Sequence, residues 1–191
     1  MSFNPSTVPP GRFFILLAVI TGVAVTLGSI GWPGHDKPRQ VVKDSKERKG
    51  APDFELKDSS GKVVHLSDYK GKVVLLDFWA LQCGACVTEL TNIEALYSRR
   101  KADGLLVLGI GSRRHPIEEV RDFFARRKEP PITYPVARDA RGAGGKTTAA
   151  YGVGLYPCYA VIDRQGLLVY LGRDWATASA KATALLDAKE R

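Results

Sequence analysis

Residues 74–86 have the sequence VLLDFWALQCGAC, and this stretch decides the fold. It contains an apolar run, a short turn and a Cys-x-x-Cys pair, Cys83 and Cys86, in front of a helical pattern. At a helix N-terminus, unpaired backbone N–H groups and the positive end of the helix dipole favour a thiolate. The pKa of a free cysteine is near ~8.5, and such positions lower it to roughly 3.5–7.5. The sequence therefore predicts a dithiol–disulfide exchange site, with Cys83 attacking and Cys86 resolving the mixed disulfide.

A Cys-x-x-Cys pair also occurs in zinc sites and as two structural cysteines. Zinc would need two more ligands, but the only other cysteine is Cys158, and the three histidines show no paired ligand spacing. An exchange site is favoured because Asp77 lies in the apolar run before the pair and an apolar segment with a proline follows far downstream.

The apolar patterns predict an alternation of strands and helices. The predicted strands are a hairpin of Phe54–Leu56 with Val63–Leu66, two buried strands at Val73–Phe78 and Leu105–Ile110, a small edge strand at Tyr134–Ala137, and a hairpin of Tyr159–Asp163 with Leu167–Leu171. The predicted helices run from about Cys83 to Arg100, from Pro116 to Arg127 and from Thr147 to Tyr151, with a closing helix at Ala176–Lys189. A continuous apolar run such as the one at 73–78 is typical of a central strand that is covered on both faces.

Several motifs resemble a known family. Residues 77–80 (DFWA) and 156–163 (YPCYAVID) resemble the thioredoxin fold. Residues 51–54 (APDF) and 66–72 (LSDYKGK) resemble the membrane-anchored thiol-disulfide oxidoreductases of the TlpA/ResA type, which include cytochrome c maturation reductases. The resemblance covers about residues 50–175. It implies an α/β, thioredoxin-like fold: a central mixed sheet with helices on both faces, an N-terminal hairpin and an inserted helix–strand element.

Two acids near the cysteines are candidate site residues. Asp77 lies in an apolar strand, where a buried carboxylate is costly unless it is protonated or paired, and desolvation raises its pKa. The resemblance implies that Asp77 lies beneath Cys86 and exchanges protons with it; the alternative is a strand-end carboxylate in solvent. Glu89 lies three residues after Cys86 on the same helix face. The resemblance implies that Glu89 tunes the thiol pair; the alternative is a solvated glutamate.

Three further residues are expected to form the substrate side of the site. The resemblance implies that Pro157 is cis and faces the cysteine pair, with Tyr156 as a backbone contact for the substrate. Gln82 stands where the family usually has tryptophan, so the rim that contacts the substrate is altered. Cys158 stands where a small residue such as threonine is usual. It is interpreted as a core residue, with a third sulfur near the pair as the alternative.

The N-terminal part of the chain predicts a membrane tether. We expect a short tail at 1–12, a transmembrane anchor at 13–32, a flexible basic linker at 33–50 and a thioredoxin-like domain at 51–191. A cleavable signal peptide is the alternative for the apolar stretch. Six Lys/Arg against two Asp/Glu in residues 37–50 favour a cytoplasmic side. Disulfide chemistry instead favours the extracytoplasmic, periplasmic side of the cell membrane, and a folded domain is translocated largely regardless of charge.

The net charge of +8 does not indicate nucleic-acid binding. Of 28 Lys/Arg and 20 Asp/Glu, seven and three lie in residues 1–50, which leaves 21 and 17, a net +4, for the rest. The basic runs there are short and are typical of solvated helix ends and loops. The partners that we expect are a protein disulfide substrate, a membrane dithiol electron donor and the membrane itself, with no nucleic acid.

The predicted function is an anchored thiol-disulfide oxidoreductase that reduces specific protein disulfides, as in cytochrome c maturation, without a cofactor or a metal. One alternative is a copper chaperone, because soft thiolates of Cys83, Cys86 and Cys158 would select Cu(I). No Met-rich segment or nearby histidine supports it. The other alternative is a thiol peroxidase, but residues 80–83 (ALQC) lack the Pro…Thr…Cys loop.

Overall fold

The computed structural model describes residues 49–112, 116–127, 131–139 and 146–188. The predicted anchor and most of the predicted linker lie outside these residues. Within the described ranges, no helix has both the length and the apolar character needed to cross a bilayer. Two residues before the predicted boundary already pair with the domain: the Leu168 N–H donates to the Lys49 carbonyl (3.0 Å), and Gly50 forms a β-bridge with Leu167.

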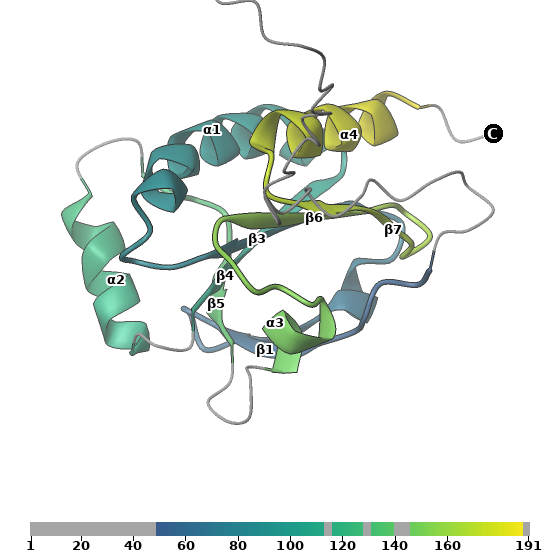
Figure 1. The fold of residues 1–191 in the computed structure, drawn as a ribbon. Helices are drawn as coiled ribbons and strands as arrows, with labels where there is room; N and C mark the ends of the chain where they lie inside the picture. The colour runs from purple at the N-terminus through teal and green to yellow at the C-terminus, as the bar shows by residue number, and fades with distance from the viewer. Residues whose placement is uncertain (1–48, 113–115, 128–130, 140–145, 189–191) are drawn as a thin grey trace, which may run out of the picture. The chain divides into compact units, whose positions relative to one another are not determined.

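The elements follow the predicted order (Figure 1). The strands are β1 (Glu55–Asp58), β2 (Val63–His65), β3 (Val73–Trp79), β4 (Leu105–Gly111), β5 (Val136–Arg138), β6 (Cys158–Ile162) and β7 (Leu168–Gly172). The helices are α1 (Gly84–Arg100), α2 (Ile117–Arg126), α3 (Lys146–Ala150) and α4 (Trp175–Asp187), with short 3-10 helices at Leu66–Tyr69 and Lys101–Asp103. This is the thioredoxin-like α/β fold that the sequence predicts.

One mixed sheet contains all seven of these strands, in the order β2-β1-β5-β4-β3-β6-β7. Strands β3, β4 and β5 are parallel, whereas β1, β2, β6 and β7 each pair antiparallel with their neighbours. Every residue of the central strand β3 is buried. Its continuous apolar sequence therefore reflects cover on both faces of the sheet.

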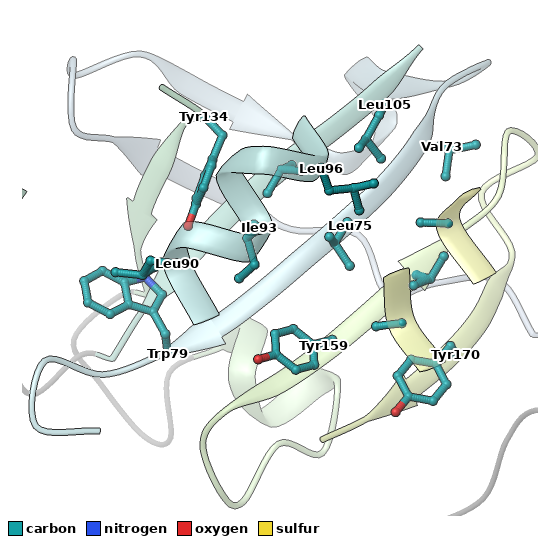
Figure 2. Close-up of a cluster of buried hydrophobic side chains, with 14 of the residues drawn as sticks. Val73, Leu75, Trp79, Leu90, Ile93, Leu96, Leu105, Tyr134, Tyr159 and Tyr170 are labelled. Atoms are coloured by element: carbon teal, nitrogen blue, oxygen red, sulfur yellow. The ribbon is translucent and has the colours of Figure 1, made fainter. Parts of the chain in front are cut away.

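The two faces of β3 support separate cores. Helices α1 and α4 lie side by side on one face, and α3 lies on the other (Figure 1). Val73, Leu75 and Trp79 join the cluster under α1 and α4, part of which is drawn in Figure 2, while Val74, Leu76 and Phe78 join the opposite cluster. Because side chains alternate along a strand, Asp77 points to the face of Leu75 and Trp79, the face that α1 covers.

The predicted edge strand at Tyr134–Ala137 is wrong in position. Strand β5 spans Val136–Arg138 and lies inside the sheet, between β4 and β1. The N-terminal hairpin adds β1 and β2 beyond it, a long-range pairing that the local sequence does not reveal. Tyr134 precedes the strand, and its side chain is buried in the core under α1.

Candidate active site

Cys83 and Cys86 form a disulfide at the N-terminus of α1, with their Cα atoms 5.2 Å apart. Strand β3 ends at Trp79, and the Cys83 N–H donates to the Ala80 carbonyl (3.1 Å), which closes the turn into the helix. Cys83 is the N-cap residue, and its sulfur accepts a hydrogen bond from the Cys86 N–H (3.1 Å). The same N–H would stabilise a Cys83 thiolate in the reduced protein.

The two sulfurs differ in access. Cys83 is half-buried, while Cys86 is only 2% exposed and packs in the core under α1. A substrate sulfur therefore reaches Cys83 first, and Cys86 is held behind it. This geometry suits the predicted division between an attacking and a resolving thiol.

The substrate side of the site contains a cis peptide bond between Tyr156 and Pro157. Tyr156 is half-buried and packs against the core cluster of Cys86, which Cys83 also contacts. Gln82 is exposed beside Cys83. The structure thus brings Tyr156, Pro157 and Gln82 to the same end of the sheet as the disulfide, as the resemblance implies.

Arg173, which the sequence analysis missed, holds this loop. Its guanidinium donates to the carbonyls of Tyr156 (3.3 Å) and Pro157 (3.4 Å). The predicted hairpin contains the signal, because the β6–β7 pairing sets Tyr159 opposite Gly172 and so brings the next residue, Arg173, beside Pro157. The backbone that is expected to pair with a substrate is therefore fixed by a cation.

Asp77 is buried, at 1% exposure, and its Oδ2 has no hydrogen-bond partner among the described residues. The alternative of a solvated strand-end carboxylate is therefore wrong. Burial, and secondarily the negative charge of Glu89, raise the pKa of Asp77 to about 8. A carboxyl group with such a pKa can exchange protons near neutral pH.

Glu89, on α1, is neither fully solvated nor in direct contact with the cysteine pair. Its side chain is half-buried, and its Oε2 accepts a hydrogen bond from Asn92 Nδ2 (2.9 Å). Its charge nevertheless acts on the carboxyl group of Asp77. The structure thus places Glu89 where it can influence the acid under the cysteine pair.

Cys158 lies on the other face of the sheet. It is 6% exposed and packs with Phe78 and Ala160, whereas Cys86 packs under α1. Burial raises the pKa of the Cys158 thiol to about 11. The three sulfurs do not converge, and the part of the chain that the structure describes holds no cluster of three or more Cys, His, Asp or Glu suited to a metal. The geometry favours the core-residue interpretation of Cys158.

An open groove runs beside the cysteine turn. Its lining combines apolar side chains with charges of both signs: Leu81, Val87, Glu119, Asp122, Phe123, Arg126 and Arg127. Leu155, just before Tyr156, is 58% exposed. Exposed apolar side chains in the segments next to Cys83 and Pro157 suit contact with a polypeptide.

Comparisons with known proteins find thiol-disulfide oxidoreductases and thioredoxin-like proteins among the relatives of this chain. The family model described as Redoxin matches residues 46–186. The chain is 31% identical to the thiol-disulfide oxidoreductase ResA of Bacillus thuringiensis subsp. konkukian over 158 residues, 83% of each chain. It is 33% identical to the thioredoxin-like protein YneN of Bacillus subtilis over 144 residues, 74% of this chain and 80% of that one.

Solved structures are similar as well. The thiol:disulfide interchange protein DsbE from Chlorobium tepidum matches with a TM-score of 0.62 and 33% identity, over 73% of this chain and 96% of that one. The pneumococcal exposed lipoprotein thioredoxin Etrx1 from Streptococcus pneumoniae matches with a TM-score of 0.60 and 31% identity, over 72% and 100%.

Proposed function

Because the chain belongs to the Redoxin family, and within it to the ResA-type thiol-disulfide oxidoreductases, we propose that it is a membrane-anchored, extracytoplasmic reductase of specific protein disulfides. The observation that carries the proposal is the Cys83–Cys86 disulfide at the start of α1, with one accessible and one buried sulfur. In the reduced protein the Cys83 thiolate attacks a substrate disulfide and one substrate sulfur leaves. Cys86 then attacks Cys83, so the substrate ends as a dithiol and the pair as a disulfide.

The position of the first described residues is compatible with the proposed anchor. Lys49 and Gly50 pair with the start of β7, beside Ile162, and Ile162 pairs with Val74 at the start of β3. The cysteines follow the other end of β3, roughly 20 Å away along seven residues of strand. The chain therefore enters the described domain at the end of the sheet opposite its redox pair, which is compatible with a tether that does not cover Cys83.

The proposed electron donor is a membrane dithiol carrier, and the proposed substrates include the Cys-x-x-Cys-His disulfides of apocytochromes c. Both follow from the family resemblance. A protein substrate is supported by Leu81, which packs against the same core cluster as Cys83 and lines the neighbouring groove.

Location is tested in intact cells of the organism that encodes the chain. A membrane-impermeant maleimide should label Cys83 in the reduced full-length protein without lysis, and the protein should remain in the membrane fraction. The matched control is Cys83→Ser, which should lose the label. Labelling that requires lysis would place the domain on the other side of the membrane and refute this part of the proposal.

The substrate class is tested by deletion. Loss of the protein should lower covalently bound haem in c-type cytochromes, and wild type but not Cys83→Ser should restore it. A small external dithiol should replace the protein, because it reduces the same disulfides chemically. Normal c-type cytochromes in the deletion strain would rule out the cytochrome role and leave the oxidoreductase activity intact.

A further inference from the structure

The end of the sheet opposite the disulfide carries a basic surface that the proposed reaction does not use. Strands β3, β4 and β7 begin at this end and β6 finishes there, because Val73 pairs with Leu105, Val74 with Ile162, and Ile162 with Leu168. The segments that lead into and out of these four strands therefore meet at one end of the domain.

Backbone hydrogen bonds join these segments. The Gly71 N–H donates to the Arg164 carbonyl (3.0 Å), and the Leu168 N–H donates to the Lys49 carbonyl (3.0 Å). We call this surface the basic end; it comprises segments 49–50, 69–72, 99–104 and 163–166, together with Asp187 at the end of α4.

The basic end has an excess of positive charge. It contains seven Lys/Arg against three Asp, a net charge of +4: Lys49, Lys70, Lys72, Arg99, Arg100, Lys101 and Arg164 against Asp103, Asp163 and Asp187. The groove beside the cysteine turn, in contrast, is lined by two acidic and two basic side chains. The charge of the domain is therefore unevenly distributed between its two ends.

The acids of the basic end are already paired within it. Asp103 and Asp187 both form ion pairs with Arg100, and Asp163 is buried and accepts hydrogen bonds from two backbone N–H groups of its own turn. Five cations are exposed, and none of them forms an ion pair within the part of the chain that the structure describes: Lys49, Lys70, Lys72, Arg99 and Lys101. Their charge is directed to something outside the domain.

The five exposed cations are spread out and do not converge on one point. Lys101 precedes β4, whereas Lys49 pairs with β7, and these strands are three positions apart in the sheet, about 14 Å at ~4.8 Å per strand. A small anion is held best by donors that converge on it with a defined geometry. A broad array of single positive charges instead matches a surface on which negative charge repeats, such as a layer of anionic lipid headgroups.

We propose that the basic end binds the anionic headgroups of a phospholipid membrane, so that the folded domain lies on the lipid surface through this end. The inference rests on the membrane location in the proposed function and is independent of how the cysteine pair reacts. Basic side chains near an anionic bilayer are attracted to it, and the attraction falls off within a Debye length, about 8 Å at physiological ionic strength. A membrane anchor on the same chain makes this contact intramolecular, so charges that are individually weak are sufficient.

The contact would control the orientation of the active site. The disulfide follows the far end of β3, so a domain that lies on its basic end exposes Cys83 to the aqueous side. The fraction of molecules in this orientation should depend on the anionic lipid content of the membrane and on ionic strength.

The test uses the full-length protein in nanodiscs of phosphatidylcholine alone or of phosphatidylcholine with an equal part of phosphatidylglycerol. Exposed lysines are acetylated with a water-soluble amine reagent, and the modified residues are quantified by peptide mass spectrometry. Lys70, Lys72 and Lys101 should react about threefold or more slowly in the anionic discs, and about 0.5 M NaCl should remove the difference. Lys57 and Lys62, exposed on the β1–β2 hairpin at the opposite edge of the sheet, are internal controls and should react equally in both discs.

Charge reversal separates the basic end from the net charge of the protein. In the triple variant Lys70→Glu, Lys72→Glu, Lys101→Glu, the protection of Lys49 in anionic discs should be lost. The matched control is Lys57→Glu, Lys62→Glu, Lys146→Glu, which changes the net charge equally at exposed positions elsewhere and should keep that protection. Circular dichroism of both variants checks that they are folded.

Equal acetylation of the three lysines in the two kinds of disc would overturn the proposal, and this is the result expected if an acidic protein, and not lipid, covers the basic end. Protection of Lys49 that survives in the first triple variant would overturn it as well. Failure of the anchor is recognised separately, because the protein would then not enter the discs. Its sedimentation with phosphatidylglycerol vesicles then decides: binding that salt and the first triple variant abolish upholds the basic end, and absence of binding refutes it.

Discussion

At the scale of single residues, we expect Asp77 to determine how the second half of the reaction depends on pH. Its pKa of about 8 leaves it mostly protonated at pH 7 and mostly charged at pH 9. If Asp77 is the general base for resolution, the charged form of Asp77 must receive the proton of Cys86. Initial attack by Cys83 depends instead on the thiolate at the start of α1. The two steps should therefore respond differently to a change at Asp77.

Asp77→Asn should slow resolution of a mixed disulfide at pH 7 by about tenfold or more, and should change the initial attack by less than about twofold. Stopped-flow measurement of both phases against pH checks this. In the wild type the resolution rate should rise with pH through about 8, and in the variant this rise should be absent. Equal resolution rates at every pH would reduce Asp77 to a structural residue.

The same substitution should make the oxidised fold more stable, to a degree that depends on pH. The folded pKa of Asp77 is raised above the value of 3.8 expected in the unfolded chain. Between these pH values the folded state binds more protons than the unfolded state, so the stability due to this group falls as pH rises through this range. The cost of burying Asp77 is absent below about pH 4 and complete above about pH 8.

Asp77→Asn should therefore raise the free energy of unfolding by roughly 1–4 kcal/mol at pH 9 and by little at pH 4. Urea denaturation at the two pH values measures the difference. Asp163→Asn is the control: the Asp163 carboxylate accepts hydrogen bonds from Gln165 N and Leu167 N, so its loss should destabilise the fold at pH 9. A gain for Asp77→Asn that does not grow with pH would contradict the account.

Cys158 is the residue on which the copper alternative depends. Since its sulfur lies across the sheet from Cys86, Cys158→Thr should leave the rate of insulin disulfide reduction within about twofold of wild type. Neither protein should hold Cu(I) tightly in a competition assay, because three thiolates do not meet. Tight copper binding in the wild type that is lost in Cys158→Thr would reverse the choice between the two functions.

At the scale of elements, the start of α1 provides the chemistry. Cys83 caps the helix and accepts the Cys86 N–H, whereas Cys86 lies one turn further in and is covered. The helix terminus stabilises charge on the first sulfur only. Reactivity of the reduced protein should therefore be concentrated on one of its three thiols.

In the reduced protein Cys83 should be the only thiol that iodoacetamide modifies readily, with a pKa below the free value of ~8.5. Peptide mass spectrometry after alkylation at a series of pH values gives both the site and the pKa. Cys158 serves as an internal control, because burial raises its pKa to about 11. Preferential modification of Cys86 would reverse the assigned roles.

The sequence predicted best those elements whose signal is local. The apolar run of β3, the 3–4 spacing of α1 and the turn before β7 each appear within a few residues, and all three were placed closely. Strand β5 was misplaced because its neighbours in the sheet are set by the distant N-terminal hairpin. At the site, Asp77 stood out as an acid in an apolar strand. Arg173 did not, because only the pairing of β6 with β7 brings it to the carbonyls of Tyr156 and Pro157.

At the scale of the whole molecule, the first described residues and the disulfide lie at opposite ends of one sheet. The backbone pairs with the start of β7 at Lys49 and Gly50, and the disulfide follows the far end of β3. Cys83 is therefore remote from the point at which the chain enters the described domain. The proposed reductase role thus requires Cys83 to form the covalent bond with each partner.

The most direct test is to trap that bond. Full-length Cys86→Ser and Cys83→Ser, each also carrying Cys158→Thr, are reduced, mixed with a disulfide-containing protein and analysed by intact-mass spectrometry. The account predicts a stable mixed disulfide on Cys83 in the first variant and none in the second. A mixed disulfide on Cys86 in the second variant, with the first left unmodified, would contradict it.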